Sequence, residues 1–361
     1  MVAHARCRKG RNGDAREWLV APVTYQGYRS GSFPAGTPSG APAGPEETWT
    51  QGKKPPSRPT SRARTGYPAS MPSLVKLTER PTLREPFMVV HLSGWTDAGL
   101  AGQAGVAFLR ARWNARPLAE FDPDELIDYR ARRPIIRLAA GTIEQISWSP
   151  IELSQGTTSG QRDALLLTGP EPDFRWNAFA DQVVEVCREL GVGEVFGLGA
   201  FPAPSLHTDP VVVLGTSADP ELAGRLETVP ATIELAAGIQ SVLEERLHRA
   251  GIPATGLWAR VPPYLAGGTH PPATVALVRS LSRLSGVEID TSELEAASKD
   301  HLEQVEQAIR ERPQIGEFIE QIRALVEQGG DDRIPSGDEI AAELERFLSQ
   351  QPPADEGGTF G

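Results

Sequence analysis

Short apolar runs alternate with helix-like patterns through the middle of the chain. Near-continuous apolar runs are typical of strands buried on both faces, and the sequence has them at 87–92, 164–168, 194–199, 211–214 and 255–261. Apolar positions at helical spacing predict helices at 100–113, 177–190, 238–250 and 272–285. Because strands alternate with helices, we predict an α/β fold with a mostly parallel sheet and helices on both of its faces.

Residues 118–153 follow a different pattern. Short apolar runs separated by Pro, Ala-Gly and Asp predict a β-meander or hairpin with Gly141 at its turn. Between two of these runs, 122–126 fits the start of a one-turn helix. This stretch therefore interrupts the alternation of strands and helices.

From Thr291 onward the sequence is charged and helical. Helices are expected at 291–312, 315–328 and 336–349, and Pro313 separates the first two. Their apolar residues form an amphipathic set that either covers the core or meets a partner helix, and core cover is the default.

The first 70 residues have no sustained period and are rich in Gly, Pro, Ser, Thr and Arg, which is typical of disorder. Met71 stands directly before the first patterned segments, so we hypothesise that translation starts there and that 1–70 is an over-extended reading frame. A basic tail that binds an acidic surface is the alternative. The predicted organisation is a disordered extension at 1–70, an α/β domain at 71–290, a helical extension at 291–350 and a disordered tail at 351–361.

Charge and cysteine content limit which classes of partner and which cellular compartment are expected. The net charge is −11, although residues 1–70 are basic, so the rest of the chain is strongly acidic and nucleic acid is not expected as a partner. The two cysteines, Cys7 and Cys187, cannot build a disulfide framework in the body, which predicts a reducing cytoplasm. No apolar run approaches the roughly 18 residues of a membrane span, so no membrane partner is expected.

Polar side chains gather in the loops after the predicted strands, where open α/β sheets place their binding crevices. After the first strand come Trp95 and Asp97. Asp97 can cap the following helix, and this structural turn is the expected reading. The alternative is an anion site at the same helix N-terminus.

The loop 169–176 carries Glu171, Arg175 and Trp176 within six residues. A carboxylate and a guanidinium beside an aromatic ring can orient a small polar molecule. Equally, two prolines can stiffen the loop while Glu171 and Arg175 pair with each other or cap the helix. The sequence leaves these two interpretations open.

His207, with Thr208 beside it, is the best candidate for acid–base chemistry, because histidine titrates near neutral pH. A structural histidine is the more common case. Ser205 lies close by without a G-x-S-x-G motif, so a serine hydrolase is rejected. Tyr264, after the last strand, is expected at the same edge of the sheet, where it contacts a ligand or another subunit.

Cofactors and metals have little support in the sequence. The chain lacks the phosphate-binding patterns G-x-x-x-x-G-K-[ST] and G-x-G-x-x-G, so no cofactor is expected. His91, His207 and His270 lack metal-ligand spacing, so no metal is expected either. His248 and His301 fall on charged helices and are expected to be solvated.

Four ordered segments carry a family resemblance. MVVHLSGWTDAGLAG, LLLTGPEPDFRW, GLGAFPAPSLHTDP and LWARVPPYLAGG resemble the proteasome assembly chaperone 2 family, and in particular its actinobacterial-type members; they lie at 88–102, 165–176, 197–210 and 257–268. The resemblance runs from about Leu77 to Leu348 and leaves 1–70 outside. It implies a three-layer α/β/α fold similar to the nucleoside phosphorylase/hydrolase-like group, and homo-oligomers that are often trimers. Eukaryotic and archaeal relatives assist assembly of the 20S proteasome, which makes proteasome subunits candidate partners.

The chain departs from the family pattern at three places. Asp209 stands where an Arg is expected, and Pro263 stands where a His is expected. The C-terminal Gly-Gly-Thr-Phe-Gly lacks the hydrophobic–Tyr–x ending by which archaeal-type chaperones dock on the proteasome. A site made by those side chains in relatives would be altered here, and direct docking through the C-terminus is not supported.

Two functions follow from these observations. The first is a non-catalytic, homo-oligomeric interaction protein resembling proteasome assembly chaperones. The alternative is an enzyme or small-molecule-binding protein, of nucleotide, nucleoside or ligase type, that uses the strand-end loops. Those candidate ligand or interface residues are Trp95, Asp97, Glu171, Arg175, Trp176, His207, Thr208 and Tyr264.

Overall fold

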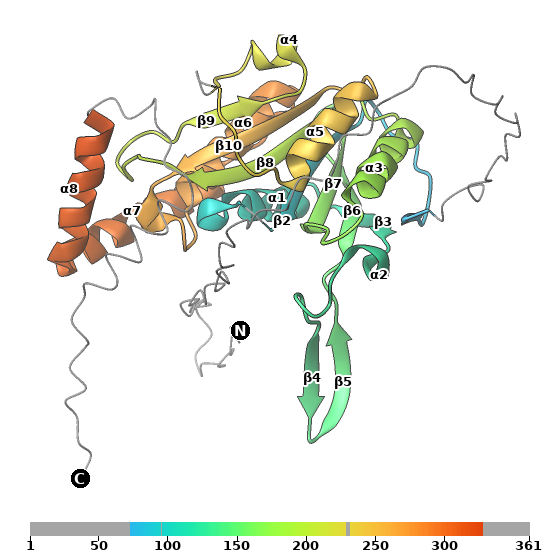
Figure 1. Ribbon diagram of the computed structural model, residues 1–361, viewed down its shortest axis with the longest axis horizontal. Coiled ribbons are helices and arrows are strands. Elements are labelled where there is room, and N and C mark those ends of the chain that lie inside the picture. Colours follow the sequence, from blue (N-terminus) through green and yellow to red (C-terminus); the bar gives the residue numbers. More distant parts are fainter. Residues whose placement is uncertain (1–72, 95, 229–231, 328–361) are drawn as a thin grey trace, which may run out of the picture. The chain divides into compact units, whose positions relative to one another are not determined.

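A computed structural model describes residues 73–94, 96–228 and 232–327 (Figure 1). The chain divides into the units Met1–Met71 and Pro72–Gly361, and the described residues belong to the second. Trp95, the extension 1–70, the helix expected at 336–349 and the tail 351–361 lie outside the described residues, so the predictions made for them stay predictions.

An eight-stranded sheet lies at the centre of the described unit, in the order β1-β3-β6-β7-β2-β8-β10-β9. Its strands are β1 (Val75–Leu77), β2 (Phe87–Ser93), β3 (Arg116–Phe121), β6 (Ile151–Thr157), β7 (Asp163–Pro170), β8 (Glu194–Pro202), β9 (Val213–Thr216) and β10 (Ala254–Val261). The four neighbours β7, β2, β8 and β10 run parallel. β1, β3 and β6 on one side and β9 on the other extend the sheet in antiparallel fashion. The sheet is therefore mixed, and its parallel part is built from the apolar runs that predicted buried strands.

Helices cover both faces of this sheet, which confirms the three-layer α/β/α prediction (Figure 1). α3 (Trp176–Leu190) and α5 (Ile239–Arg249) pack on one face. α1 (Ala101–Arg112) and α6 (Pro271–Ser285) pack on the other. The remaining elements are η1 (Ala98–Leu100), α2 (Pro123–Leu126), α4 (Pro220–Ala223), η2 (Pro263–Leu265), α7 (Ser292–Glu311) and α8 (Pro313–Glu327).

Strand β2 explains why an uninterrupted apolar run forms the middle of the sheet. Met88 and Val90 belong to the hydrophobic cluster under α3 and α5. Phe87 and Val89 belong to the cluster under α1 and α6. Successive side chains of a strand point to opposite faces, so a strand between two helical layers needs apolar residues at every position.

Close approach of α1 to the sheet depends on a small residue, Gly102. A Cβ on Gly102 would lie 2.6 Å from His91 Nδ1 and 2.8 Å from the Leu198 carbonyl oxygen. Those distances are too short for any real side chain, so glycine is required where the helix crosses β2 and β8.

On the opposite face, Cys187 of α3 is fully buried, and burial raises the pKa of its thiol to about 12. It acts as a small apolar core residue.

The hairpin predicted within 118–153 is confirmed. β4 (Ile135–Ala139) and β5 (Thr142–Ser147) form a separate two-stranded sheet that extends away from the large sheet (Figure 1). Ala140 and Gly141 both have positive φ, as a two-residue type I′ turn requires. Every residue of both strands is exposed. We call residues 130–148, which contain this hairpin, the arm.

The C-terminal helices confirm the expected break at Pro313, where α8 begins. Ile319 and Ile322 of α8 are buried with Leu206 of the loop after β8. This part of the helical extension therefore covers apolar surface of the same chain, as the default interpretation expected.

Candidate functional site

The polar residues predicted after the strands lie in three separate clusters. One surrounds Asp97, one contains Glu171, and one joins His207 to Tyr264. They lie beyond the carboxyl ends of the parallel strands, as expected for this fold. The third cluster borders a groove whose lining, among the described residues, includes His207 and Thr208 but neither Asp97 nor Glu171.

Asp97 caps α1. Its Oδ1 accepts a hydrogen bond from the backbone N–H of Gly102 at 2.7 Å, and its Oδ2 accepts one from the N–H of Gln103 at 2.9 Å. Oδ2 also lies 3.5 Å from Nε2 of the buried His91, whose Nδ1 donates to the Leu198 carbonyl. The carboxylate thus occupies the positive end of the helix itself, which favours the structural turn over an anion site.

Removing this cap gives a first testable prediction. We expect Asp97→Ala to lower the free energy of unfolding by about 1–2 kcal/mol, because two backbone N–H groups lose their acceptor. Urea denaturation measures the change. Asp122→Ala is the matched control, since Asp122 caps only the one-turn helix α2 and should cost less. Equal losses for the two variants would contradict the assignment of Asp97 as the main cap.

The loop 169–176 holds neighbouring elements together, which favours the structural interpretation, although Glu171 and Arg175 do not pair with each other. Glu171 Oε1 accepts the backbone N–H of Ile239 at 2.7 Å, so it caps α5 and not its own helix. Arg175 forms an ion pair with Glu125. Trp176 turns back onto its own loop and donates its indole N–H to the Pro172 carbonyl at 2.6 Å. Each of these side chains is held by the protein, because capping and packing consume the groups that a ligand would use.

His207 is held from both sides. Its Nδ1 lies 2.8 Å from the Tyr264 hydroxyl, and its Nε2 lies 3.0 Å from Glu306 Oε1 on α7. The same hydroxyl accepts the backbone N–H of His207 at 2.9 Å. These contacts fit one tautomer, in which Tyr264 donates to Nδ1 and Nε2–H donates to the carboxylate.

Burial raises the pKa of the Tyr264 hydroxyl to about 12, so this group stays protonated and acts as a donor. His207 is only 8% exposed, and both of its ring nitrogens are engaged. The His207–Tyr264–Glu306 chain therefore locks the loop after β8 to the loop after β10 and to α7.

A second histidine contact lies nearby, and it corrects the expectation that His301 is solvated. His270 Nδ1 lies 3.4 Å from His301 Nε2, and the two rings are 5.5 Å apart. Burial, reinforced by the His301 and His207 charges, lowers the pKa of His270 to about 4. Burial, followed by the His207 charge, also lowers the pKa of His301. Both rings are neutral at pH 7, and one donates to the other.

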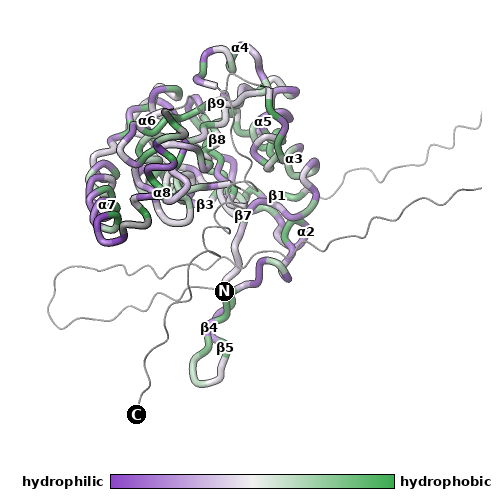
Figure 2. Tube along the Cα trace, turned by 60° about the vertical axis from the view of Figure 1, so that its left-hand side comes forward, coloured by the Kyte–Doolittle hydropathy of each residue, from purple (hydrophilic) through white to green (hydrophobic). Residues whose placement is uncertain are grey.

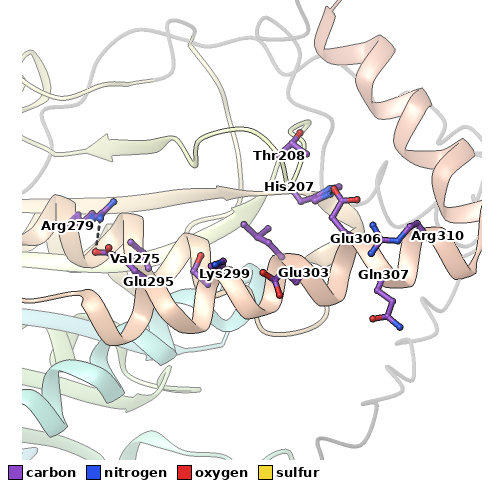
Figure 3. Close-up of a pocket in the computed structure, with 12 residues that line it drawn as sticks. His207, Thr208, Val275, Arg279, Glu295, Lys299, Glu303, Glu306, Gln307 and Arg310 are labelled. Atoms are coloured by element: carbon purple, nitrogen blue, oxygen red, sulfur yellow. Dashed lines mark hydrogen bonds and ion pairs between the residues drawn. The ribbon is translucent and has the colours of Figure 1, made fainter.

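A groove of about 900 Å³ runs along α7 beside His207 and Thr208 (Figure 3). Its walls are α7, one side of α6 and the loop after β8. Arg279 of α6 forms an ion pair with Glu295 of α7 at 2.7 Å across it. Lys299 and Arg310 bring positive charge, and Glu303 and Glu306 bring negative charge. Acids and bases balance along this groove, so it has no strong preference for ligands of one charge.

A buried carboxyl lies on the opposite face of the sheet, where the sequence gave no signal for it. Glu244 of α5 is 7% exposed, and its Oε2 accepts the Thr216 hydroxyl at 2.9 Å. Thr216 in turn accepts the Trp258 indole N–H at 3.0 Å. Burial raises the pKa of Glu244 to about 7, although the hydrogen bond from Thr216 acts against it. Such a carboxyl is largely protonated in mildly acidic solution.

The positions that depart from the family pattern have local roles. Asp209 Oδ2 accepts the backbone N–H of Leu206 at 3.2 Å and so closes its own turn. Pro263 begins the short helix η2, directly before Tyr264. Across the described part of the chain, no group of three or more His, Cys, Asp or Glu side chains is placed to hold a metal ion. Of the helices described, none is long and apolar enough to cross a membrane.

The residues that sequence reasoning missed come from distant segments. Glu306 lies 99 positions from His207, and Ile239 lies 68 positions from Glu171. A helix cap supplied by another loop leaves no local pattern, because the capped N–H belongs to the backbone. The sequence did not single out Glu306, because α7 has many charged residues.

The chain resembles known proteins in sequence and in fold. The model of the PAC2 family matches residues 91–309, which include the end of β2, all of β7, β8 and β10, and the loops that follow these four strands. The chain belongs to the PAC2 family. No match was found among curated proteins.

Solved structures of PAC2-type proteins agree with this assignment. A PAC2 family protein from Streptomyces avermitilis is 34% identical, with a TM-score of 0.57, over 62% of this chain and 95% of that one. A proteasome-assembly chaperone homologue from Mycobacterium tuberculosis is 33% identical, with a TM-score of 0.61, over 64% and 99%. A protein of unknown function from Corynebacterium glutamicum is 27% identical, with a TM-score of 0.64, over 76% and 99%. The actinobacterial-type resemblance of the sequence is confirmed.

Proposed function

We propose that this PAC2 protein is a non-catalytic, homo-oligomeric interaction protein of the cytoplasm that acts on proteasome subunits. The observation that carries the proposal is family membership, together with the similarity to the M. tuberculosis proteasome-assembly chaperone homologue over 99% of that chain. A trimer is the oligomer that the sequence resemblance favours.

The geometry of the strand ends supports an interaction role. Asp97 and Glu171 cap helices, and His207 is hydrogen-bonded at both ring nitrogens. A general acid or base needs a nitrogen or oxygen within reach of a substrate proton. Here the best candidates for acid–base chemistry instead hold loops and helices together.

The experiment that tests this function is direct binding. The purified full chain is mixed with separately purified α-type and β-type proteasome subunits from the same organism, and native mass spectrometry counts the subunits in each complex. We expect a complex of fixed stoichiometry with at least one of the two. If neither subunit forms a complex over the accessible concentrations, the proteasome role is wrong.

The groove along α7 favours a second candidate, a protein that binds a small polar or phosphorylated molecule such as a nucleotide or nucleoside. Its volume of about 900 Å³ falls within the usual range for ligand sites. A ligand at 100 times its dissociation constant adds about 2.7 kcal/mol to stability, so thermal shift detects it. Loss of that shift in Lys299→Ala would place the ligand in the groove, and no shift across nucleotides, nucleosides and amino acids would exclude those classes.

A further inference from the structure

A small pocket lies at the edge of the sheet, where β9 and α6 lie side by side (Figure 2). Its volume is about 120 Å³. One water molecule occupies about 30 Å³ of the liquid, and sites for drug-sized molecules begin at about 300 Å³. The pocket therefore has room for a small ion. It shares no lining residue with the groove along α7, so what it binds does not depend on the function proposed above.

The segment after α4 forms one wall of this pocket. The backbone N–H of Gly215 in β9 donates to the Glu227 carbonyl at 2.6 Å. A Cβ on Gly215 would lie 2.5 Å from the side chain of Leu226, so only glycine allows this segment to lie so close to β9. The close approach brings Arg225 to the pocket.

Helix α6 forms another wall. Ser280, Arg283 and Leu284 line the pocket from one face of this helix, because residues three and four positions apart are neighbours on a helix surface. The strands contribute Val213 and the buried Leu257. Apolar walls lower the local dielectric constant, so charges interact more strongly here than on an open surface.

Two guanidinium groups line this pocket without a counter-ion. For the side chains of Arg225 and Arg283, the described residues provide neither an ion pair nor a hydrogen bond. By contrast, Arg279, one turn before Arg283 on α6, pairs with Glu295. Like charges that line one small pocket repel each other, and an anion between them removes that cost. Guanidinium groups suit phosphate oxygens in particular, because they can donate two parallel N–H bonds.

A buried hydroxyl adds a further donor. Ser280 is 8% exposed and lines the pocket, and none of the described groups forms a hydrogen bond with its hydroxyl. Buried polar groups are normally hydrogen-bonded. An unused hydroxyl beside two unpaired guanidinium groups therefore indicates that the partner of all three is a ligand.

Glu227 also lines the pocket, and an ionised carboxylate only accepts hydrogen bonds. The ligand that suits all four side chains is an anion that still carries a proton. Near neutral pH inorganic phosphate carries at least one proton, whereas sulfate carries none. We propose that this pocket binds inorganic phosphate, with Arg225, Arg283 and Ser280 donating to its oxygens and Glu227 accepting a hydrogen bond from its hydroxyl.

Isothermal titration calorimetry of the full chain near neutral pH and at physiological salt tests this site with inorganic phosphate and with sulfate. We expect one phosphate per chain, bound at least about tenfold more tightly than sulfate. Arg283→Gln should weaken phosphate binding at least about tenfold, because a hydrogen bond between charged groups is lost. Arg116→Gln is the matched control, since it removes the same charge from an exposed position on β3. It should change the dissociation constant by less than about twofold, because salt screens distant charges.

A second variant tests the proton acceptor separately from the attraction between charges. Glu227→Gln keeps both arginines, and its amide can donate as well as accept. We expect it to bind sulfate as tightly as phosphate. Circular dichroism spectra that match wild type establish that each variant is folded.

Four results would overturn the proposal in different ways. No heat of binding up to millimolar phosphate would remove the site. Equal affinity of wild type for phosphate and sulfate would leave an adventitious ion only. Equal weakening by Arg283→Gln and Arg116→Gln would show attraction to the overall charge and not to this pocket. Tighter binding of glycerol 3-phosphate than of inorganic phosphate would assign the pocket to the phosphate group of a larger molecule.

Discussion

Glu244→Gln should make the protein more stable than wild type in alkaline solution and leave it nearly unchanged in acid. The folded protein holds the proton of Glu244 up to about pH 7, whereas the unfolded chain releases it near pH 4.5. The neutral carboxyl is therefore compatible with its buried site at low pH, and stability is lost as the pH rises from 4.5 through 7. A raised pKa of this size corresponds to about 3 kcal/mol.

Denaturation at one protein concentration, between pH 4.5 and pH 8, measures this effect. The glutamine cannot ionise, so the difference between variant and wild type should grow by about 3 kcal/mol across the range. Glu245→Gln is the matched control, because Glu245 is the next residue of α5, is partly exposed and pairs with Arg249. A difference that stays constant with pH would show that Glu244 is already ionised in mildly acidic solution. A fixed protein concentration matters because self-association shifts apparent stability.

His270→Asn should have the opposite pH dependence. The folded protein keeps His270 neutral down to about pH 4, whereas the unfolded chain takes up the proton near pH 6.5. Stability from the neutral ring is complete above pH 6.5 and is lost as the pH falls towards 4. Removing this group should abolish about 3 kcal/mol of acid destabilisation. Asparagine suits the position, because residue 270 is the N-cap of α6.

The slope with pH is the readout for His270, since loss of the ring also leaves a cavity whose cost does not depend on pH. The exposed His248 provides the control variant, His248→Asn. If the free energy of unfolding falls as steeply with decreasing pH in His270→Asn as in wild type, then the pKa of His270 is not lowered in the folded protein.

The two groups act against each other between pH 4.5 and pH 6.5. Glu244 favours the folded state in acid, and His270 favours it in alkali. Wild type should consequently show a flatter dependence on pH in this window than either single variant. The double variant should lose both of these contributions and keep that of His301, whose pKa is also lowered.

Most of the fold could be predicted from the sequence, because the patterns that indicate strands, turns and helix ends are local. Uninterrupted apolar runs such as 87–92 predicted strands between two helical layers, and β2 lies there. The turn at Gly141 and the break at Pro313 followed from the backbone chemistry of glycine and proline. The antiparallel direction of β9 at the sheet edge had no such signal, since pairing direction depends on how the chain returns.

The site was accessible only in part. Asp97 was recognised as a cap, because a cap and its helix are neighbours in sequence. Tyr264 and His207 were each selected, but their direct contact, 57 positions apart, was not foreseen. The role of Glu171 was left open and its actual partner, the N–H of Ile239, was not among the alternatives, and the His270–His301 contact was missed. All of these contacts join different loops and helices, so they exist only after the core has packed.

The apolar face of the arm could also be predicted only in part. The sequence predicted a hairpin, and the register then placed Ile136, Leu138, Ile143 and Ile146 on one face. A one-residue shift in pairing would move each strand's side chains to the opposite face. Since the pairing includes a bulge after Arg137, the apolar patch could be recognised only from the structure.

Assembly of 20S particles tests the central claim, that this protein acts through interactions with proteasome subunits. Purified α-type and β-type subunits are mixed with and without the full chain, and the formation of assembled particles is followed by native mass spectrometry over time. We expect intermediates that contain this protein and a changed rate of particle formation. Unchanged assembly kinetics, with no subunit complex of this protein at any time, would contradict it.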